Sequence, residues 1–107
     1  MQILRNLYQV GGDLNGVTYA GIDAGFDDCN TYVVATPEGL LLFDCGCGDT
    51  LDQIHCNMRY WGLDPADIRA CLITHAHLDH AGAAYRLKAA GARLIAHVET
   101  ADAVAAG

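Results

Sequence analysis

The sequence predicts a single α/β domain. Short apolar runs of strand length alternate with segments whose apolar residues recur at helical spacing, and this alternation is typical of α/β proteins. The chain has 107 residues, of which 52% are hydrophobic and 18% charged, so its composition is that of a globular protein rather than a disordered one. It contains no linker, repeat or low-complexity stretch, and we therefore expect one domain over residues 1–107.

The N-terminal part of the chain is predicted to be mostly strand. Residues 2–10 and 17–22 each have the composition of a strand, and a polar, glycine-containing loop follows over residues 23–28. Residues 31–35 and 40–43 are predicted to form a hairpin, because the Pro and Gly between them suit a turn.

A helix is predicted to follow from Thr50. Thr50 as N-cap and Gln53 three residues later match a capping box, and Gly62 is the expected end of the helix. The apolar residues at helical spacing are expected to face the sheet; they are Leu51, Ile54, Met58 and Trp61. His55 lies on another face of this helix, and we expect it in solvent.

A second strand–helix–strand unit is predicted after this helix. Asp64 is expected to cap a short turn that has Pro65 at its first position. The elements expected next are a strand over 68–73, a helix over 81–90 that ends at Gly91, a strand over 92–96, and a helix from Thr100 onward.

The densest cluster of chemically active side chains follows the 68–73 strand. His75, His77, Asp79 and His80 lie within six consecutive residues, and imidazole with carboxylate is a ligand set that suits Zn²⁺, and also Fe or Mn. Residues i and i+2 of an extended strand end point the same way, so His75 and His77 are expected to form one ligand pair. Asp79 and His80 could hold a second ion or orient a water. The alternative is that the histidines are surface loop residues and Asp79 is a helix N-cap.

The five cysteines do not suggest a disulfide framework. Their number is odd and no C-x-x-C pair exists, which favours reduced thiols and a cytoplasmic protein. Cys45 and Cys47 flank Gly46 and could bind a metal, but small residues in a tight loop are the favoured interpretation. His97 follows a predicted strand and is interpreted as a polar loop residue rather than a ligand.

The net charge, the first residues and the lengths of the apolar runs argue against several classes of function. The formal net charge is −7, which argues against nucleic-acid binding because phosphate contacts need Lys and Arg. The first residues lack the pattern of a signal peptide, and no apolar run has the length of a membrane span, so neither secretion nor a membrane partner is expected.

Three motifs together resemble the metallo-β-lactamase superfamily. Residues 75–80 are similar to its H-x-H-x-D-H signature, residues 30–34 to its N-x-Y-(V/L)-V strand, and residues 39–46 to its apolar strand ending in Asp-x-Gly. Their order and intervals also fit, and the resemblance covers roughly residues 17–106. Within this superfamily, the resemblance is to glyoxalase II-like metal-dependent hydrolases.

The resemblance implies a fold, a metal centre and a reaction. The fold would be the N-terminal half of an αβ/βα sandwich, with a mixed sheet and helices on one face. The metal ligands would be His75, His77, Asp79 and His80, holding one or two Zn²⁺ ions, with Fe or Mn possible. Metal-bound hydroxide would hydrolyse an ester, thioester, lactone or lactam bond of a small molecule. Asp79 would orient the water, bind the second metal or accept a proton, and Asp44 would accept a hydrogen bond from a ligand histidine.

The chain ends at Gly107, before the positions where the family carries its remaining metal ligands. The resemblance therefore implies a partial domain whose inner sheet face is exposed, and we expect a homodimer through that face. Two other interpretations stay open: a non-catalytic metal-binding or self-associating remnant of the fold, and a di-iron redox variant.

Overall fold

The structure is a computed structural model, and it describes residues 2–12, 30–74 and 76–105. The side chains of Asp49, Leu78, Asp79 and Ala105 are not part of this description. Several sequence predictions lie outside the described residues: the strand over 17–22, the loop over 23–28, Cys29 and His75.

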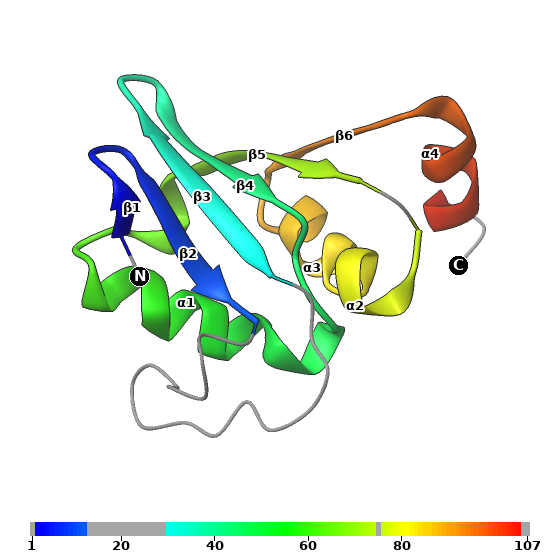
Figure 1. The fold of residues 1–107 in the computed structure, drawn as a ribbon. Coiled ribbons are helices and arrows are strands. Elements are labelled where there is room, and N and C mark those ends of the chain that lie inside the picture. The colour runs from blue at the N-terminus through cyan, green and yellow to red at the C-terminus, as the bar shows by residue number, and fades with distance from the viewer. Residues whose placement is uncertain (1, 13–29, 75, 106–107) are drawn as a thin grey trace.

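The described residues form one six-stranded mixed sheet with helices beside it (Figure 1). The strands lie in sequence order, and β1 to β4 are antiparallel while β4, β5 and β6 are parallel. The elements are β1 (Gln2–Leu4), β2 (Leu7–Gly11), β3 (Thr31–Thr36), β4 (Gly39–Phe43), the 3-10 turn η2 (Gly48–Thr50), α1 (Leu51–Tyr60), the 3-10 turn η3 (Pro65–Asp67), β5 (Ile68–Ile73), α2 (Leu78–Ala81), α3 (Ala84–Ala89), β6 (Arg93–Ala96) and α4 (Val98–Ala105). The predicted α/β class and mixed sheet are confirmed.

The single strand predicted over residues 2–10 is wrong, because the chain turns within it. β1 and β2 form a tight hairpin in which Leu4 pairs with Leu7 across Arg5 and Asn6. The carbonyl of Asn6 accepts a hydrogen bond from the N–H of Ala35 at 2.9 Å, which ties the turn to β3. Asn is a common turn residue, and here it interrupts an otherwise strand-like run.

The β3–β4 hairpin agrees with the sequence prediction. Gly39 opens β4 with a φ of +134°, a conformation that L side chains rarely adopt. A Cβ atom at this position would also lie 2.5 Å from Cγ of Arg69 and 2.8 Å from the carbonyl oxygen of Asp67. The glycine in this turn is therefore required both by backbone conformation and by space.

The start of α1 differs from the prediction, whereas its end agrees. Thr50 makes no capping hydrogen bond with its side chain; its hydroxyl donates instead to the carbonyl of Cys47 at 2.9 Å, within the turn η2. The predicted capping box is therefore wrong. At the other end Gly62 has a φ of +76°, and the N–H groups of Gly62 and Leu63 donate to the carbonyls of Arg59 and Met58. This is the Schellman arrangement expected at a glycine C-terminus.

The single helix predicted over 81–90 is wrong at its start: α3 covers only Ala84–Ala89, and a separate helix α2 ends at Ala81. Between them the N–H of the fully buried Ala83 donates to the carbonyl of Gly46 at 3.2 Å, outside the helix. This tertiary hydrogen bond replaces an intrahelical one and divides the segment. The predicted C-terminus holds, since Gly91 has a φ of +98°.

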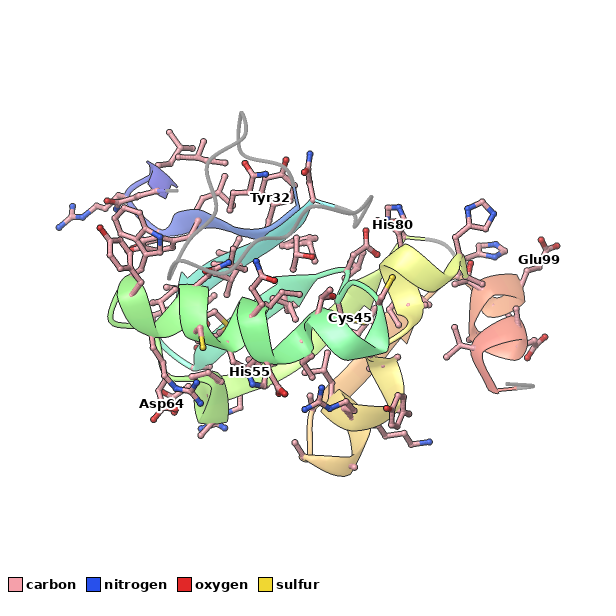
Figure 2. All side chains as sticks on the ribbon, turned by 90° about the horizontal axis from the view of Figure 1, so that it is seen from below. Tyr32, Cys45, His55, Asp64, His80 and Glu99 are labelled. Atoms are coloured by element: carbon pink, nitrogen blue, oxygen red, sulfur yellow. The ribbon has the colours of Figure 1, made fainter. Side chains whose placement is uncertain are left out.

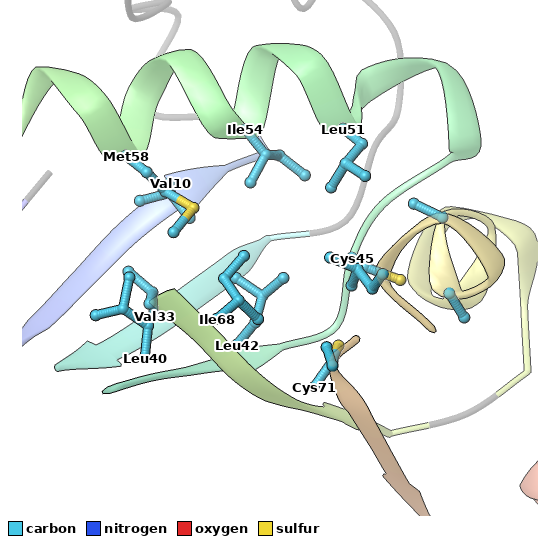
Figure 3. Packing of buried hydrophobic residues seen from close by; sticks show 14 of the residues in the cluster. Val10, Val33, Leu40, Leu42, Cys45, Leu51, Ile54, Met58, Ile68 and Cys71 are labelled. Carbon is cyan, nitrogen blue, oxygen red and sulfur yellow. The ribbon is translucent and has the colours of Figure 1, made fainter. Parts of the chain in front are cut away.

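One face of the sheet carries the hydrophobic core (Figure 3). Val33, Leu42 and Cys71 are aligned across β3, β4 and β5, and each is fully buried. The helix residues packed on this face are Leu51, Ile54, Met58, Ala84 and Leu87. Helices α1 and α3 therefore cover the same side of the sheet, as Figures 1 and 2 also show.

The opposite face of the sheet is apolar but only partly covered. Side chains alternate between the faces of a strand, so the row Tyr32, Phe43, Leu72 and Ile95 points away from α1 and α3. The first three are half-buried and Ile95 is 44% exposed. In the described ranges no helix lies over this face.

The helices in the described part of the chain are all too short or too polar to span a membrane.

Candidate metal centre

Asp44 lies at the carboxyl end of β4, directly after Phe43. Its φ is +59°, and it is the one residue other than glycine with a positive φ among the described residues. Aspartate tolerates this left-handed region better than most residues do. The residue is 5% exposed, and its N–H donates to the carbonyl of Leu72 on β5 at 2.8 Å. The backbone thus bends the Asp44 side chain towards the end of β5.

The Asp44 carboxylate accepts hydrogen bonds from two elements that follow β5. Oδ1 accepts the backbone N–H of Thr74 at 2.8 Å, and Oδ2 accepts the Thr74 hydroxyl at 2.8 Å. Oδ2 also lies 2.9 Å from Nδ1 of His80, on α2. Parallel pairing of β4 and β5 puts both strand ends at one edge of the sheet, which explains why residues thirty or more positions apart meet here.

This contact selects one form of the His80 ring. An ionised carboxylate can only accept, so Nδ1 of His80 carries the hydrogen that faces Asp44. In the neutral ring Nε2 then keeps its lone pair, which is the form that a metal ion binds. The His80 side chain is 22% exposed, whereas that of Asp44 is 7% exposed. The carboxylate is therefore buried behind a ring that remains accessible.

The loop after Asp44 fixes α2 in place (Figure 2). The N–H and thiol of the buried Cys45 both donate to the carbonyl of His80, at 2.9 and 3.2 Å. Within α2, the N–H groups of His80 and Ala81 donate to the carbonyl of His77 at 2.9 Å. Cys45 thus holds the backbone of the motif, while Cys47 is half-buried in the same tight loop.

The structure brings together part of the predicted site. His77 is exposed on the segment that leads into α2, and its backbone belongs to the same hydrogen-bonded turn as His80. His75 and the Asp79 side chain lie outside the described residues. Within residues 2–12, 30–74 and 76–105, no three His, Cys, Asp or Glu side chains gather closely enough to hold a metal ion. The predicted ligand set of His75, His77, Asp79 and His80 stays a prediction, and the His80 ring, with Nδ1 towards Asp44 and Nε2 away from it, fits that set.

Thr74 is the residue that the sequence analysis did not single out. It follows β5 directly and, among the described residues, donates two of the three hydrogen bonds that the Asp44 carboxylate accepts. Its position immediately before the first motif histidine was the available sign that it belongs to the site.

His97 has a local role at the far end of β6. It is exposed, and its Nδ1 accepts the N–H of Glu99 at 3.2 Å, at the start of α4. This helix begins two residues before the predicted start at Thr100. His97 therefore caps a helix, which suits its interpretation as a polar residue outside the ligand set.

His55 is not in solvent, contrary to the sequence prediction. It is half-buried on α1, and its buried Nε2 has no hydrogen-bond partner in the described part of the chain. It lines a cavity of about 200 Å³ that Pro65, Ile68, Arg86 and Leu87 also line. Burial lowers the pKa of His55 below its ordinary value, and the nearby cations Arg59 and Arg86 lower it further.

Comparison with known proteins identifies the family. The family model described as the metallo-beta-lactamase superfamily matches residues 24–105. The chain belongs to this superfamily. The match includes Asp44, Thr74 and the whole 75–80 motif, so the geometry described above lies within the matched region.

Solved structures of metallo-beta-lactamases have the same fold over the described chain. A Cronobacter sakazakii metallo-beta-lactamase with a HARLDQ motif is 33% identical with a TM-score of 0.77, and the match covers 95% of this chain and 36% of that one. A subclass B3 metallo-beta-lactamase of Bradyrhizobium japonicum is 35% identical with a TM-score of 0.67, covering 88% of this chain and 31% of that one. The chain therefore spans about a third of the length of these relatives.

The motif of the Cronobacter protein differs from that of this chain in an informative way. HARLDQ agrees with residues 75–80 except at positions 77 and 80, where this chain has histidine. A mutant of the Cronobacter protein that carries arginine-to-histidine and glutamine-to-histidine changes, among others, is 34% identical to this chain with a TM-score of 0.76. Of the two motifs, that of this chain is the richer in imidazole.

Proposed function

We propose that this protein is a metal-dependent hydrolase, or the N-terminal part of one, that binds zinc at the 75–80 motif and cleaves an ester, thioester, lactone or lactam bond of a small molecule. The observation that carries the proposal is the Asp44–His80 contact, in which the carboxylate faces Nδ1 of His80 and Nε2 points away from it. Membership of the superfamily and the likeness to metallo-beta-lactamases support the same function.

The residues proposed to hold the metal are His75, His77, Asp79 and His80, and iron or manganese are the alternatives to zinc. A bound zinc ion would polarise the scissile carbonyl and lower the pKa of a water molecule. Asp79 is proposed as the catalytic residue that orients this water or accepts its proton. Asp44 would keep the His80 ring in the correct form and orientation throughout, since its carboxylate is fixed by Thr74.

We further propose that two copies of the chain associate through the uncovered sheet face. That face presents Tyr32, Phe43, Leu72 and Ile95 in one row across four strands, and a contiguous apolar surface of this kind is typical of an interface. A cytoplasmic location is proposed because the number of cysteines is odd and no C-x-x-C pair exists, which favours reduced thiols.

The function is tested by zinc content and hydrolysis measured on the same samples. Wild-type protein, equilibrated with zinc and dialysed, is expected to retain at least about one equivalent and to hydrolyse at least one compound from a panel of β-lactams, thioesters and lactones. His77→Ala should lose both properties, and His55→Gln, at a histidine far from the motif in sequence, should keep both. Zinc binding without hydrolysis would favour a metal-binding remnant, and absence of both would overturn the proposal. Light scattering that shows a monomer would refute the dimer alone.

A further inference from the structure

We propose that Thr74 is a positioning residue for the metal centre: its hydroxyl fixes the Asp44 carboxylate so that His80 presents Nε2 outward in a single ring form. The expected effect on zinc affinity rests on the proposed function. The expected ring form of His80 concerns the metal-free protein and does not depend on it. It starts from the two hydrogen bonds that Thr74 makes to one carboxylate, at 2.8 Å each.

The two hydrogen bonds fix different degrees of freedom of the Asp44 side chain. The backbone N–H of Thr74 holds Oδ1, which leaves the carboxylate able to rotate about this single contact. The hydroxyl holds Oδ2 and thereby fixes the plane of the group. Because Oδ2 is also the atom that faces Nδ1 of His80, the hydroxyl of Thr74 decides where the acceptor for the ring lies.

The hydroxyl hydrogen of Thr74 is directed to Asp44 and not to His80. Oγ1 is 2.8 Å from Oδ2 of Asp44 but 3.5 Å from Nδ1 of His80. A hydroxyl has one hydrogen, and the carboxylate is both the nearer and the charged acceptor. Thr74 therefore acts on His80 through Asp44 and does not compete for the ring nitrogen.

Threonine suits this role better than serine does. Its branched Cβ restricts rotation about χ1, and its backbone is held at the end of β5, so the hydroxyl is fixed before any ligand arrives. Valine has nearly the same shape but lacks the hydroxyl, so it would remove the hydrogen bond from Thr74 to Oδ2 and keep the contact of Oδ2 with His80. Loss of an outer partner of this kind in a metal site costs about 10-fold to 100-fold in metal affinity.

The first test is histidine ring NMR on metal-free protein labelled with ¹⁵N. In wild type, His80 is expected to be a single Nδ1–H form whose ring N–H exchanges slowly with water. Thr74→Val should show a mixture of ring forms or a rapidly exchanging N–H, while Thr74→Ser should remain close to wild type. The matched control is Thr36→Val, which removes a hydroxyl that donates to the carbonyl of Gly39 at 2.7 Å in the β3–β4 turn.

The second test is zinc affinity, measured by competition with a chromophoric chelator. Thr74→Val should bind zinc about 10-fold more weakly than wild type, and Thr74→Ser and Thr36→Val should stay within about 3-fold. A change in the ring spectrum together with an unchanged thermal midpoint would distinguish positioning from a general effect on folding.

The results that would overturn the inference are distinct from those that would overturn the proposed function. If wild-type His80 is mainly the Nε2–H form, or if Thr74→Val keeps both the wild-type ring spectrum and the wild-type affinity, Thr74 is not a positioning residue. If the protein binds no zinc, the proposed function fails, yet the ring spectra of the metal-free proteins still decide the role of Thr74. If Thr74→Val does not fold, the ring form of His80 in the wild-type protein decides: the Nδ1–H form supports the inference and the Nε2–H form overturns it.

Discussion

Two histidines of this chain lie in contrasting surroundings. His80 lies at the sheet edge where β4 and β5 end, and His55 lies on helix α1. At the edge, His80 has Nδ1 2.9 Å from the buried Asp44 carboxylate. In the helix layer, His55 is half-buried on α1, and its Nε2 has no partner in the described ranges. The carboxylate beside Nδ1 of His80 favours the ring form in which Nε2 can bind a metal ion. Burial beside the cations Arg59 and Arg86 only makes the charged ring unfavourable.

The contrast separates the residues that build the hydrophobic core from those that build the candidate metal centre. The helix layer consists of apolar side chains on one face of the sheet, and most of its stability comes from burial. The edge consists of a backbone in a left-handed conformation and of polar contacts between β4, β5 and α2. Strained, polar arrangements of this kind persist where a function needs them.

Asp44→Asn should have the largest effect on the edge. Asparagine tolerates the left-handed backbone, but its Nδ2 donates where the carboxylate accepted, so His80 would turn to the Nε2–H form and lose its lone pair there. We expect zinc affinity to fall about 100-fold, measured by chelator competition. Asp52→Asn, at a carboxylate with a 78% exposed side chain, is the matched control. A fall in zinc affinity of less than about 3-fold in Asp44→Asn would contradict the assignment of metal binding to the sheet edge.

Ile54→Ala should affect the helix layer and leave the edge intact. Ile54 is 1% exposed between α1 and the sheet, and truncation of such a residue costs about 3 kcal/mol of unfolding free energy. Urea denaturation measures this loss. Zinc affinity of the folded fraction should stay within about 3-fold of wild type. If Ile54→Ala weakened zinc binding as much as Asp44→Asn, the two regions would not be separate.

The helix layer should also lose stability in acid through His55. Its folded pKa lies below the ordinary value of 6.5, so the unfolded chain takes up this proton at a higher pH than the folded chain does. The stability that neutral His55 contributes is present above pH 6.5 and is lost as the pH falls below it. His55→Gln should therefore lose less stability than wild type between pH 7.5 and 5, measured by urea midpoints. Equal losses in both proteins would contradict the assignment.

Asp52→Asn should have the smallest effect. Arg86 donates to Oδ1 of Asp52 at 2.7 Å, and this hydrogen bond with the Arg86 charge lowers the pKa of the carboxyl. Stabilisation from a lowered carboxyl pKa is present above the ordinary value of 3.8 and disappears as the pH falls below it. Exposed ion pairs contribute little, so the urea midpoint should fall only slightly at pH 7 and by less at pH 3. A large fall at pH 7 would mean that the pair organises the helix layer.

The elements that the sequence predicted best are those with strong local signals. The strand over 68–73 has the predicted bounds, because an apolar run follows the Asp64–Pro65 turn, in which Asp64 caps through a 2.9 Å hydrogen bond to the N–H of Ala66. The break between α2 and α3 was missed because it depends on Ala83 donating to Gly46, a contact between segments far apart in sequence. Local helix signals contain no information about such a contact.

For the candidate site, the sequence predicted the contact between Asp44 and a motif histidine, and the ligand set stays a prediction. The spacing of the histidines and Asp79 marked the motif, and Asp44 was expected beside a motif histidine, as its contact with His80 now describes. The part played by Thr74 depends on the register of β4 against β5, which pairs Leu42 with Cys71 and so brings Asp44 level with the end of β5. A single sequence does not give that register.

The most direct test of the central claim, that the edge of the sheet and not the helix layer holds the metal, is zinc content by ICP-MS after equilibration and dialysis. It compares wild type with His77→Ala and His55→Gln. We predict at least about one equivalent in wild type and in His55→Gln, and a loss of it in His77→Ala. Equal zinc in all three proteins, or a loss in His55→Gln alone, would contradict the claim.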